Sequence, residues 1–457
     1  MESNLSQPRD TWGSKLTFVL AAAGSAIGLG NIWAFPTNAA ANGGGAFLVV
    51  YLICVVMIGA PVMLAEFAIG RTTSRNPVGA FKALAPKSMW KALGGLGVVT
   101  GVIILSFYAV IAGWTVAYIF KCIAGTFKPG VDTLTIFEEM SGNPLTAIGY
   151  LFVFMGLTIY VVVGGVRDGI ERWTKVLMPV LLVLLGIRAV TLSGAGEGLS
   201  FYFKPDFSLI NAKVILAAAG QAFFSLSLGM GTMITYGSYI SKKEDLVSST
   251  LWVSGLDTGI AILAGLIIFP TLFHAGLGLQ EGGPGMVFVV LTSLLGEMPP
   301  APYGGIIFGT GFFLLLGIAA ITSSVSLLEV GVAYVVDEKQ ISRKKAGLWL
   351  GGMAFVLGIP SALGNGAVSW LTTIPGVGMD LLSFLFEVFG QYSLALGALL
   401  ISIFVGWRWG VDAAAAEVEA EGNIFRFKRT WSFLIKFLCP ITLTVILLNK
   451  LWQVIMG

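Results

Sequence analysis

Long apolar segments alternate with short polar ones along almost the whole chain. A helix of about 20 apolar residues crosses a bilayer, and windows of this kind recur often enough to predict eleven transmembrane helices. The predicted spans are 15–40, 44–70, 92–122, 145–164, 173–193, 212–240, 246–273, 304–336, 345–363, 380–407 and 430–454. The pattern therefore predicts an all-α polytopic membrane protein.

Polar and flexible residues interrupt two of these spans at mid-depth. The first, KLTFVLAAAGSAIGLGNIWAFP at 15–36, carries several glycines together with Ser25 and Asn31 in its middle. The sixth contains GQAFFSLSLGMG at 220–231. Lipid cannot hydrogen-bond the backbone groups that a broken helix leaves free, so we expect irregular backbone only where it lines a cavity inside the protein. Interrupted helices five spans apart indicate an inverted repeat with a binding site between them.

The composition agrees with a protein that lies mostly within a bilayer. The chain is 56% hydrophobic and 11% charged, whereas soluble domains carry about a quarter charged residues. Lys and Arg concentrate on one side of the predicted spans, which places the N-terminus in the cytoplasm and the C-terminus outside. These residues lie in short loops, so the net charge of +3 does not indicate a nucleic-acid partner. Cys54, Cys122 and Cys439 are expected to be buried apolar residues.

The segments between the spans complete the predicted organisation. The first 15 residues are polar, so no cleavable signal peptide is expected. The stretch at 274–303 joins a glycine-rich turn to an amphipathic piece too short to span, which is typical of a lid over a vestibule. The predicted parts are a cytoplasmic N-terminal latch (1–14), a first repeat (15–193), an extracellular loop (194–211), a second repeat (212–407) that includes the extracellular lid (274–303), a solvated cytoplasmic connector (408–429) and a last helix (430–457).

Four motifs in order carry a family resemblance over nearly the whole chain. They are AAAGSAIGLGNIWAFP at 21–36, NGGGAF at 42–47, GQAFFSLSLGMG at 220–231 and AAITSS at 319–324. Together they resemble the neurotransmitter:sodium symporter family, and above all its bacterial amino-acid branch of LeuT-like and multi-hydrophobic-substrate transporters. The resemblance implies a LeuT-type 5+5 inverted repeat with helices 1 and 6 broken. It also implies Na⁺-driven import of amino acids across the inner membrane by alternating access, with no enzymatic activity and with the oligomeric state open.

The resemblance implies two sodium sites built from neutral oxygens, which are suitable hard ligands for Na⁺. One site would use the carbonyls of Gly24, Ile27 and Ala319 with the hydroxyls of Thr322 and Ser323. The other would use the carbonyl of Ala26 with the side chains of Asn31, Ser225 and Asp257. From the residues alone, the hydroxyls at 322–324 could equally bond the preceding turn of their own helix.

Asp257 also bears on the use of chloride. Chloride-dependent relatives carry asparagine at this position and a serine one turn on, where this chain has Ala261, whereas Tyr51, Gln221 and Ser225 of the chloride-site pattern are present. A carboxylate within a span requires a cation or a proton. We therefore expect Asp257 to supply the negative charge, so that transport needs no chloride. The alternative is that Asp257 faces a loop near the start of its span.

The resemblance also implies the residues that contact the substrate. They are Ala26, Leu29, Gly30, Ile104, Tyr108, Phe224, Ser225, Ser227, Met230, Ser323 and Leu327. The N–H groups of Leu29 and Gly30 and the Tyr108 hydroxyl would hold a carboxylate, at a position suited to helix N-termini, while carbonyls and the Ser227 hydroxyl would hold an ammonium. Monoamine carriers have an aspartate where this chain has Gly28, so the substrate is expected to be an amino acid. The other contact residues are mostly apolar, and Met230 adapts its shape readily. They favour hydrophobic L-amino acids as substrates.

The resemblance places gates on both sides of this pocket. RDTW at 9–12 matches an inner latch in which Arg9 pairs with Asp337 and Trp12 lies beside them. Tyr108 and Phe224 would form the outer aromatic lid. From the residues alone, ordinary helix packing explains these two rings equally well, and the positive-inside bias explains the arginine.

Three further features complete the family pattern or depart from it. The family motif NIWRFP carries an outer-gate arginine, but this chain has Ala34, so Asp380 lacks that partner and could face a cationic substrate instead. Gly169 and Pro179 match the spacing that unwinds the inner end of helix 5, although a simple kink is the alternative. Glu66 is expected to cap freed N–H groups of the broken helices.

Other functional classes fit less well. An intramembrane protease needs a histidine at membrane depth, but His274, the single histidine, lies at the outer edge of a span. A channel needs a filter loop or a charged ring, and neither is visible. A transporter of a cationic or other polar amino acid, and a sensor that binds Na⁺ and an amino acid without moving them, stay open as alternatives.

Overall fold

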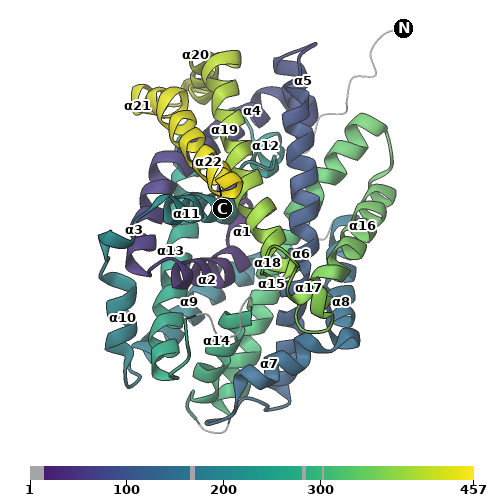
Figure 1. The fold of residues 1–457 in the computed structure, drawn as a ribbon. Helices are drawn as coiled ribbons and strands as arrows, with labels where there is room; N and C mark the ends of the chain where they lie inside the picture. Colours follow the sequence, from purple (N-terminus) through teal and green to yellow (C-terminus); the bar gives the residue numbers. More distant parts are fainter. Residues whose placement is uncertain (1–14, 165–169, 280–284, 301–302, 457) are drawn as a thin grey trace.

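The computed structural model describes residues 15–164, 170–279, 285–300 and 303–456. These residues fold into a helical assembly in which no strand occurs (Figure 1). The all-α fold class predicted from the apolar pattern is therefore confirmed. The three cysteines are buried and free, also as predicted.

The helices of the first part follow the predicted spans closely. They are α1 (Lys15–Ala26), η1 (Gly30–Ala34), α2 (Phe35–Ala41), α3 (Gly45–Cys54), η2 (Val55–Gly59), α4 (Ala60–Thr73), α5 (Pro77–Leu84), α6 (Lys91–Ile123), α7 (Thr133–Gly142), α8 (Pro144–Gly164), α9 (Ile170–Val190), α10 (Ala195–Phe203) and η3 (Phe207–Leu209).

The second part begins with a short helix and contains the longest one. Its elements are α11 (Ala212–Ser225), α12 (Thr232–Gly237), α13 (Leu246–His274), α14 (Met286–Gly296), α15 (Gly304–Lys339), α16 (Arg343–Leu363), α17 (Ser369–Thr372), α18 (Leu381–Leu385), η5 (Phe386–Ser393), α19 (Leu394–Ile403), η6 (Phe404–Gly410), α20 (Val411–Val418), η7 (Ala420–Gly422), α21 (Lys428–Phe433), η8 (Leu434–Leu438) and α22 (Cys439–Met456).

Eight continuous helical stretches among the described residues are long and apolar enough to cross a bilayer. The two interrupted spans do not pass this criterion as single helices, because each is divided into shorter pieces. The predicted total of eleven spans therefore stays a prediction. The tenth predicted span, 380–407, is longer than expected, since α18, η5, α19, η6 and α20 form one helical stretch from Leu381 to Val418. Ala414, Ala415 and Val418 of the predicted connector are buried rather than solvated.

Both interruptions predicted from the glycine-rich motifs are confirmed. Helix α1 ends at Ala26, and residues 27–28 are not helical. Helix α11 ends at Ser225 and α12 begins at Thr232. Between them the backbone enters the left-handed region, with φ of 56° at Ser227, 78° at Gly229 and 81° at Gly231. Glycine adopts such angles without steric penalty, which explains two of the three residues.

Helix α19 packs directly against the second break. A Cβ atom on Gly397 would lie 2.1 Å from the carbonyl oxygen of Gly229, and a Cβ on Gly229 would lie 2.3 Å from that of Leu394. The close approach of the two backbones therefore depends on glycine on both sides. It holds the irregular segment against a continuous helix.

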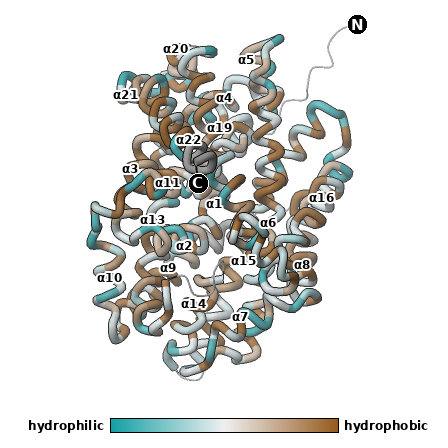
Figure 2. Tube along the Cα trace, viewed as in Figure 1, coloured by the Kyte–Doolittle hydropathy of each residue, from teal (hydrophilic) through white to brown (hydrophobic). Residues whose placement is uncertain are grey.

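The long helices α6 and α15 pack against each other, and α1 lies against α13 and α15. Polar residues gather at the two ends of the assembly, whereas the helices between them are largely apolar (Figure 2). Large apolar side chains, including Phe152, Trp252 and Trp349, are exposed on the outside. Exposed apolar surface of this kind suits contact with lipid, in agreement with a multi-pass membrane protein.

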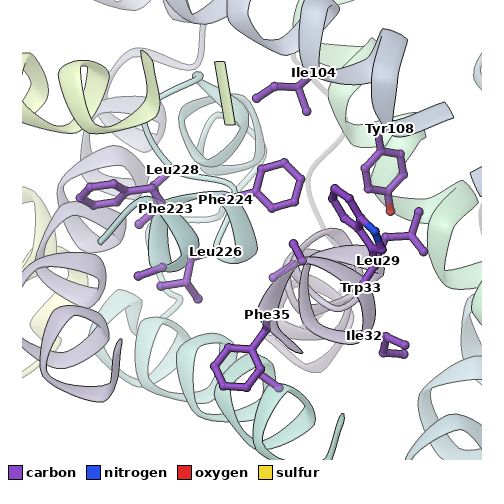
Figure 3. Close-up of a cluster of buried hydrophobic side chains, with 14 of the residues drawn as sticks. Leu29, Ile32, Trp33, Phe35, Ile104, Tyr108, Phe223, Phe224, Leu226 and Leu228 are labelled. Carbon is purple, nitrogen blue, oxygen red and sulfur yellow. The ribbon is translucent and has the colours of Figure 1, made fainter. Parts of the chain in front are cut away.

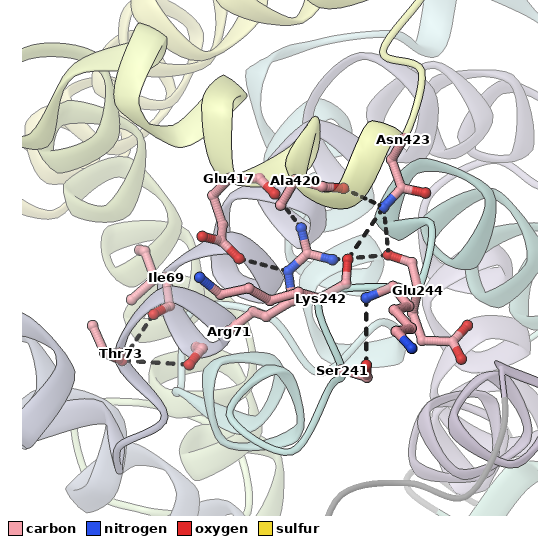
Figure 4. A network of polar contacts seen from close by, with 11 residues as sticks. Ile69, Arg71, Thr73, Ser241, Lys242, Glu244, Glu417, Ala420 and Asn423 are labelled. Carbon is pink, nitrogen blue, oxygen red and sulfur yellow. Dashed lines mark hydrogen bonds and ion pairs between the residues drawn. The ribbon is translucent and has the colours of Figure 1, made fainter.

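A buried arginine joins three segments at one end of the assembly (Figure 4). The Arg71 guanidinium, from α4, forms an ion pair with Glu417 of α20 at 2.7 Å and donates to the Glu244 carbonyl at 2.8 Å. It also donates to the backbone carbonyl of Glu417. Asn423 donates to the carbonyls of Ala420 at 2.8 Å and of Lys242 at 3.3 Å. These bonds tie the long stretch Leu381–Val418 to α4 and to the segment before α13.

Candidate functional site

A small cavity lies between the two interrupted spans on one side and the continuous helices α6 and α15 on the other. Its lining residues are Ser25, Ala26, Gly30, Ile104, Tyr108, Phe224, Ser227, Met230, Ser323 and Leu327. All the predicted substrate contacts belong to this set except Leu29 and Ser225. The Leu29 side chain lies instead beside Trp33 and Phe288, and Ser225 belongs to a polar cluster described below.

The polar end of the cavity is formed around Gly28. A Cβ atom there would lie 2.6 Å from Ser323 Oγ and 3.0 Å from the Tyr108 hydroxyl, so only glycine leaves room between the two hydroxyls. The Tyr108 hydroxyl is buried and has no hydrogen-bond partner among the described residues. Ser25 Oγ, from just before Gly28 in the chain, is also buried and has no hydrogen-bond partner among the described residues. Because buried polar atoms are normally satisfied, these two hydroxyls are suited to hydrogen-bond a bound polar molecule.

The other end of the cavity is apolar and is covered by aromatic rings. Phe224 points towards Tyr108 across the space between the two interrupted helices, with Ile104 nearby (Figure 3). Phe386 of η5 packs edge-to-face on Phe224, with ring centroids 5.1 Å apart, and on Trp33 at 5.2 Å. These rings form an aromatic roof over the cavity. Phe386 and Trp33 were not predicted as part of it, because the sequence of an apolar span does not indicate which ring contacts a distant helix.

The predicted ligands of one sodium site come together between α1 and α15. Thr322 Oγ1 donates to the carbonyls of Gly24 and Ala319, both at 2.8 Å. Ser323 Oγ donates to the carbonyls of Ser25 at 3.1 Å and Ala319 at 3.2 Å. The two hydroxyls thus donate to the preceding turn of their own helix, which was the alternative to sodium binding, and they also donate to carbonyls at the end of α1. Ile27, the remaining predicted ligand, lies at the break itself. A cation bound here would be coordinated by the same carbonyl and hydroxyl oxygens, in place of the hydrogen bonds between them.

The side chains predicted for the other sodium site form a second cluster. Ser225 Oγ donates to both carboxylate oxygens of Asp257, at 2.8 and 3.0 Å. Asn31 Nδ2 donates to Asp257 Oδ1 at 2.7 Å and to Ser225 Oγ at 3.1 Å, while its Oδ1 accepts from the Gly28 N–H at 3.0 Å. Ala26, the predicted carbonyl ligand, lines the adjacent cavity. The cluster therefore contacts the break of the first span directly.

Asp257 has no exposed surface. The alternative that it faces a loop is therefore wrong, because α13 extends well beyond it on both sides and brings it against Asn31 of η1 and Ser225 of α11. The Tyr51 hydroxyl donates to its Oδ2 at 3.4 Å. Gln221, expected nearby from the chloride-site pattern, instead donates to the Gly30 carbonyl at 2.8 Å and accepts from Asn38 at 2.9 Å. Gln391 extends this chain of amides to η5 by donating to Asn38 at 3.3 Å.

Glu66 lies at the second break. It is fully buried, and its Oε1 accepts from the Gly229 N–H at 2.7 Å. Within the described residues its Oε2 has no hydrogen-bond partner. The carboxyl group thus satisfies an N–H freed by the interruption of the helix, as the sequence predicted.

The predicted gate residues are only partly within the described residues. Arg9, Trp12 and Gly169 lie outside them. Asp337, near the end of α15, accepts from the side-chain and backbone nitrogens of Asn76, at 3.0 and 3.3 Å. Pro179 lies inside α9.

A wide vestibule lies on the other side of the aromatic roof. Trp33, Phe386 and Ala34 line it, together with the carboxylates of Asp380 and Glu387. Asp380 Oδ1 accepts from the Ser383 N–H at 2.9 Å and so caps α18. The pocket is therefore separated from an open vestibule by a layer of aromatic side chains.

Two helices interrupted at mid-depth around a cavity define the class of ion-coupled secondary transporters. The comparison with family models agrees: the model described as the Sodium:neurotransmitter symporter family matches residues 9–130 and 135–456. The chain belongs to this family, as the four motifs predicted, and it is a sodium-coupled transporter rather than an enzyme.

Individual relatives are similar over nearly their full length. An uncharacterized sodium-dependent transporter of Bacillus subtilis (strain 168) is 37% identical over 96% of this chain and 97% of its own. One from Haemophilus influenzae is 35% identical over 97% and 98% of the two chains. The crystal structure of MhsT in complex with L-phenylalanine matches with a TM-score of 0.90 and 45% identity, over 96% of this chain and 99% of that one. The predicted LeuT-type fold and the bacterial branch are confirmed.

Proposed function

We propose that this protein imports hydrophobic L-amino acids together with Na⁺ by alternating access, and that it does so without chloride. The observation that carries this proposal is the cavity between the two helix breaks. It presents unpartnered hydroxyls at one end, Ile104, Phe224, Met230 and Leu327 at the other, and carbonyl-rich clusters directly beside it. Such a cavity suits a zwitterion with an apolar side chain.

The polar end would hold the two charged groups of the substrate. The Tyr108 hydroxyl and the N–H groups of Leu29 and Gly30 would donate to the carboxylate, in the space that Gly28 leaves free. The ammonium would be held by the carbonyls of Ala26, Phe224 and Ser225 and by the Ser227 hydroxyl. These groups belong to helix ends, whose dipoles favour opposite charges at opposite ends.

Two sodium ions would be bound and carried with the substrate. One would lie among Gly24, Ile27, Ala319, Thr322 and Ser323, where the hydroxyls already contact the α1 carbonyls. The other would lie among Ala26, Asn31, Ser225 and Asp257. A buried carboxylate requires a cation or a proton, and with Na⁺ bound beside it Asp257 would supply the charge that chloride supplies in other members. We accordingly propose that chloride is not required.

Alternating access would expose the cavity to one side of the membrane at a time. From the outside, the aromatic roof of Phe224, Tyr108 and Phe386 would open and close the way from the vestibule. On the inside, Arg9, Trp12 and Asp337 would form the latch, and Gly169 and Pro179 would let helix 5 unwind for release of Na⁺. We place the protein in the inner membrane with its N-terminus in the cytoplasm and its C-terminus outside.

Uptake by purified protein in proteoliposomes tests the proposal. An inward Na⁺ gradient should drive accumulation of labelled leucine or phenylalanine, and replacing chloride by gluconate should leave the rate unchanged. Competition by lysine stronger than by leucine would favour a cationic substrate and contradict the apolar assignment. Na⁺-dependent binding without uptake or counterflow would identify a sensor and overturn the transport proposal.

A further inference from the structure

The outer vestibule carries charged side chains on its walls. Among its described lining residues, Lys213 is the single cation, and Asp380 and Glu387 are the two carboxylates. Ala34 lines the same space and contributes no charge. Lys213 forms no ion pair with any described residue, and its side chain is exposed. The vestibule lining therefore contains one ammonium that has no ion-pair partner among the described residues and two carboxylates, of which Glu387 has a partner of its own.

The backbone positions of these groups are fixed by helix caps. Lys213 is the second residue of α11, and its N–H donates to the N-cap residue Asn211 at 2.9 Å. Asp380 is the N-cap of α18 and accepts from Ser383 at 2.9 Å. Helix α11 is one half of an interrupted span, whereas α18 begins the long stretch Leu381–Val418, so movement of α11 relative to α18 would change the separation of the two groups.

Asp380 is the better partner of the two carboxylates. Glu387 already accepts from the Tyr392 hydroxyl on its own helix. Asp380 uses one carboxylate oxygen for its helix cap, and its position at the start of α18 leaves it facing the vestibule. A lysine carries its charge on a flexible four-carbon stem, so its ammonium can follow a moving carboxylate through a range of positions.

We propose that Lys213 pairs with Asp380 when the vestibule closes, and that it supplies the outer-gate charge that Ala34 lacks. Closure expels water, and a charge left unpaired in a dehydrated space destabilises the closed state, whereas paired charges compensate each other. Lys213 thus acts as a positioning residue for the closed outer gate. This inference rests on the alternating-access transport proposed above, because a protein that never closes its vestibule has no use for the pair.

The test compares single, conservative and exchanged variants in proteoliposomes. Lys213→Ala and Asp380→Asn should each lower the maximal uptake rate roughly three- to tenfold, the range expected for a partly dehydrated pair. Na⁺-dependent equilibrium binding of the substrate should change less than the rate does. Lys213→Arg should keep most of the rate, and the exchange Lys213→Asp with Asp380→Lys should exceed either single variant. Lys204→Ala, an exposed lysine outside the vestibule lining, is the matched control.

A second measurement follows the gate itself. A cysteine introduced as Ala41→Cys, at an exposed position of the vestibule lining, reports access from outside to a membrane-impermeant thiol reagent, since the three native cysteines are buried. Na⁺ with substrate should slow its modification, and Lys213→Ala should remove most of that protection. If Lys213→Ala matches Lys204→Ala in rate and in protection, or if the exchange gives no rescue, the inference is wrong. Failure of the unsubstituted protein to take up any amino acid would instead overturn the proposed function.

Discussion

At the scale of single residues, the proposed chemistry depends on a few polar groups buried in an apolar protein. Asp257 is fully buried but accepts from Asn31, Ser225 and Tyr51. A buried carboxylate with partners this close is oriented before any cation arrives. Tyr108 is the opposite case, because its hydroxyl is buried and has no partner among the described residues. These two residues give the sharpest tests of the ion site and of the substrate site.

Replacing Asp257 by asparagine should lower Na⁺-driven uptake in chloride-free buffer by roughly 100-fold or more, because it removes the buried charge opposite the cation. Chloride should partly restore uptake, and more so when Ala261→Ser is added. Asp412→Asn is the control, since Asp412 is exposed on α20. Radiolabel uptake in gluconate and in chloride measures both effects. Normal chloride-free uptake by Asp257→Asn would contradict the role given to this carboxylate.

Replacing Tyr108 by phenylalanine should raise the substrate KM roughly 10- to 100-fold, because a hydrogen bond to a charged carboxylate contributes about 1.5–3 kcal/mol. The ring itself keeps its packing. Tyr118→Phe is a matched control, since the Tyr118 hydroxyl is likewise buried without a partner among the described residues but does not line the cavity. Saturation curves for uptake give KM for each variant. Equal KM values for the two variants would show that Tyr108 does not hold the substrate.

At the scale of elements, the breaks depend on the continuous helices beside them. Helix α19 contacts the second break through glycine, and Glu66 of α4 accepts from an N–H in the same segment. The irregular backbone is therefore held from two sides. At the end of the assembly that the sequence predicts to face the cytoplasm, Arg71 ties α20 to α4 in a similar way.

Replacing Gly397 by alanine should separate α19 from the second break. The new Cβ would lie 2.1 Å from the Gly229 carbonyl oxygen, which is backbone and cannot rotate away. Overpacking of this kind costs about 1–3 kcal/mol, so thermal unfolding in detergent should shift downward and Na⁺-dependent substrate binding should weaken. Gly352→Ala, where no atom lies within 4 Å of the new Cβ, should be neutral or slightly stabilising. Similar unfolding midpoints for the two variants would contradict this account.

Replacing Arg71 by alanine should destabilise the protein by about 3–5 kcal/mol, the usual result of leaving one partner of a buried ion pair alone. Its side chain is 0% exposed and that of Glu417 is 10% exposed. Lys82→Ala is the control, because Lys82 is 58% exposed in its pair with Glu338 and solvent-exposed pairs contribute about 0–1 kcal/mol. Thermal unfolding of both variants in the same detergent measures the difference. An equal effect of the two substitutions would argue against a structural role for the Arg71 network.

At the scale of the whole molecule, the cavity, the ion clusters and the vestibule involve helices from both halves of the chain. At the proposed sites, Na⁺ would therefore join α1 and η1 to α13 and α15, and the substrate would join them to α6 and α11. A ligand that binds only the folded protein stabilises it in proportion to its saturation. Occupation of these sites should accordingly be visible in the stability of the entire assembly.

Exchanging Na⁺ for choline should lower the thermal unfolding midpoint, because Na⁺ at about 100 times its Kd adds about 2.7 kcal/mol to the stability. Leucine or phenylalanine should raise the midpoint further in Na⁺ and have little effect in choline. Chloride in place of gluconate should leave it unchanged. Potassium at the same ionic strength is the control for general salt effects. Equal stabilisation by potassium would contradict specific sodium sites.

Much of the fold was predictable because the determining signals are local. A run of about 20 apolar residues predicts a span wherever it occurs, and glycines with Asn31 at mid-depth indicate a break that only a cavity tolerates. Asp257 and Glu66 could be selected for the same reason, since a carboxylate inside a span requires a partner, whereas Tyr108 follows only from the family resemblance, because helix packing explains its ring equally well. The end of the tenth span could not be predicted, because Ala414, Ala415 and Val418 are buried by neighbours that composition does not reveal.

The sequence by itself thus determined the apolar segments, the two interruptions and the polar residues that must be satisfied within the membrane, because each follows from a local pattern. Only the tertiary structure decided which distant side chains meet. It directs Gln221 to Gly30 and Asn38 instead of Asp257, brings Phe386 onto Phe224, and places Lys213 in the vestibule with Asp380. These contacts depend on the rotation and packing of helices far apart in the chain, which no local pattern encodes.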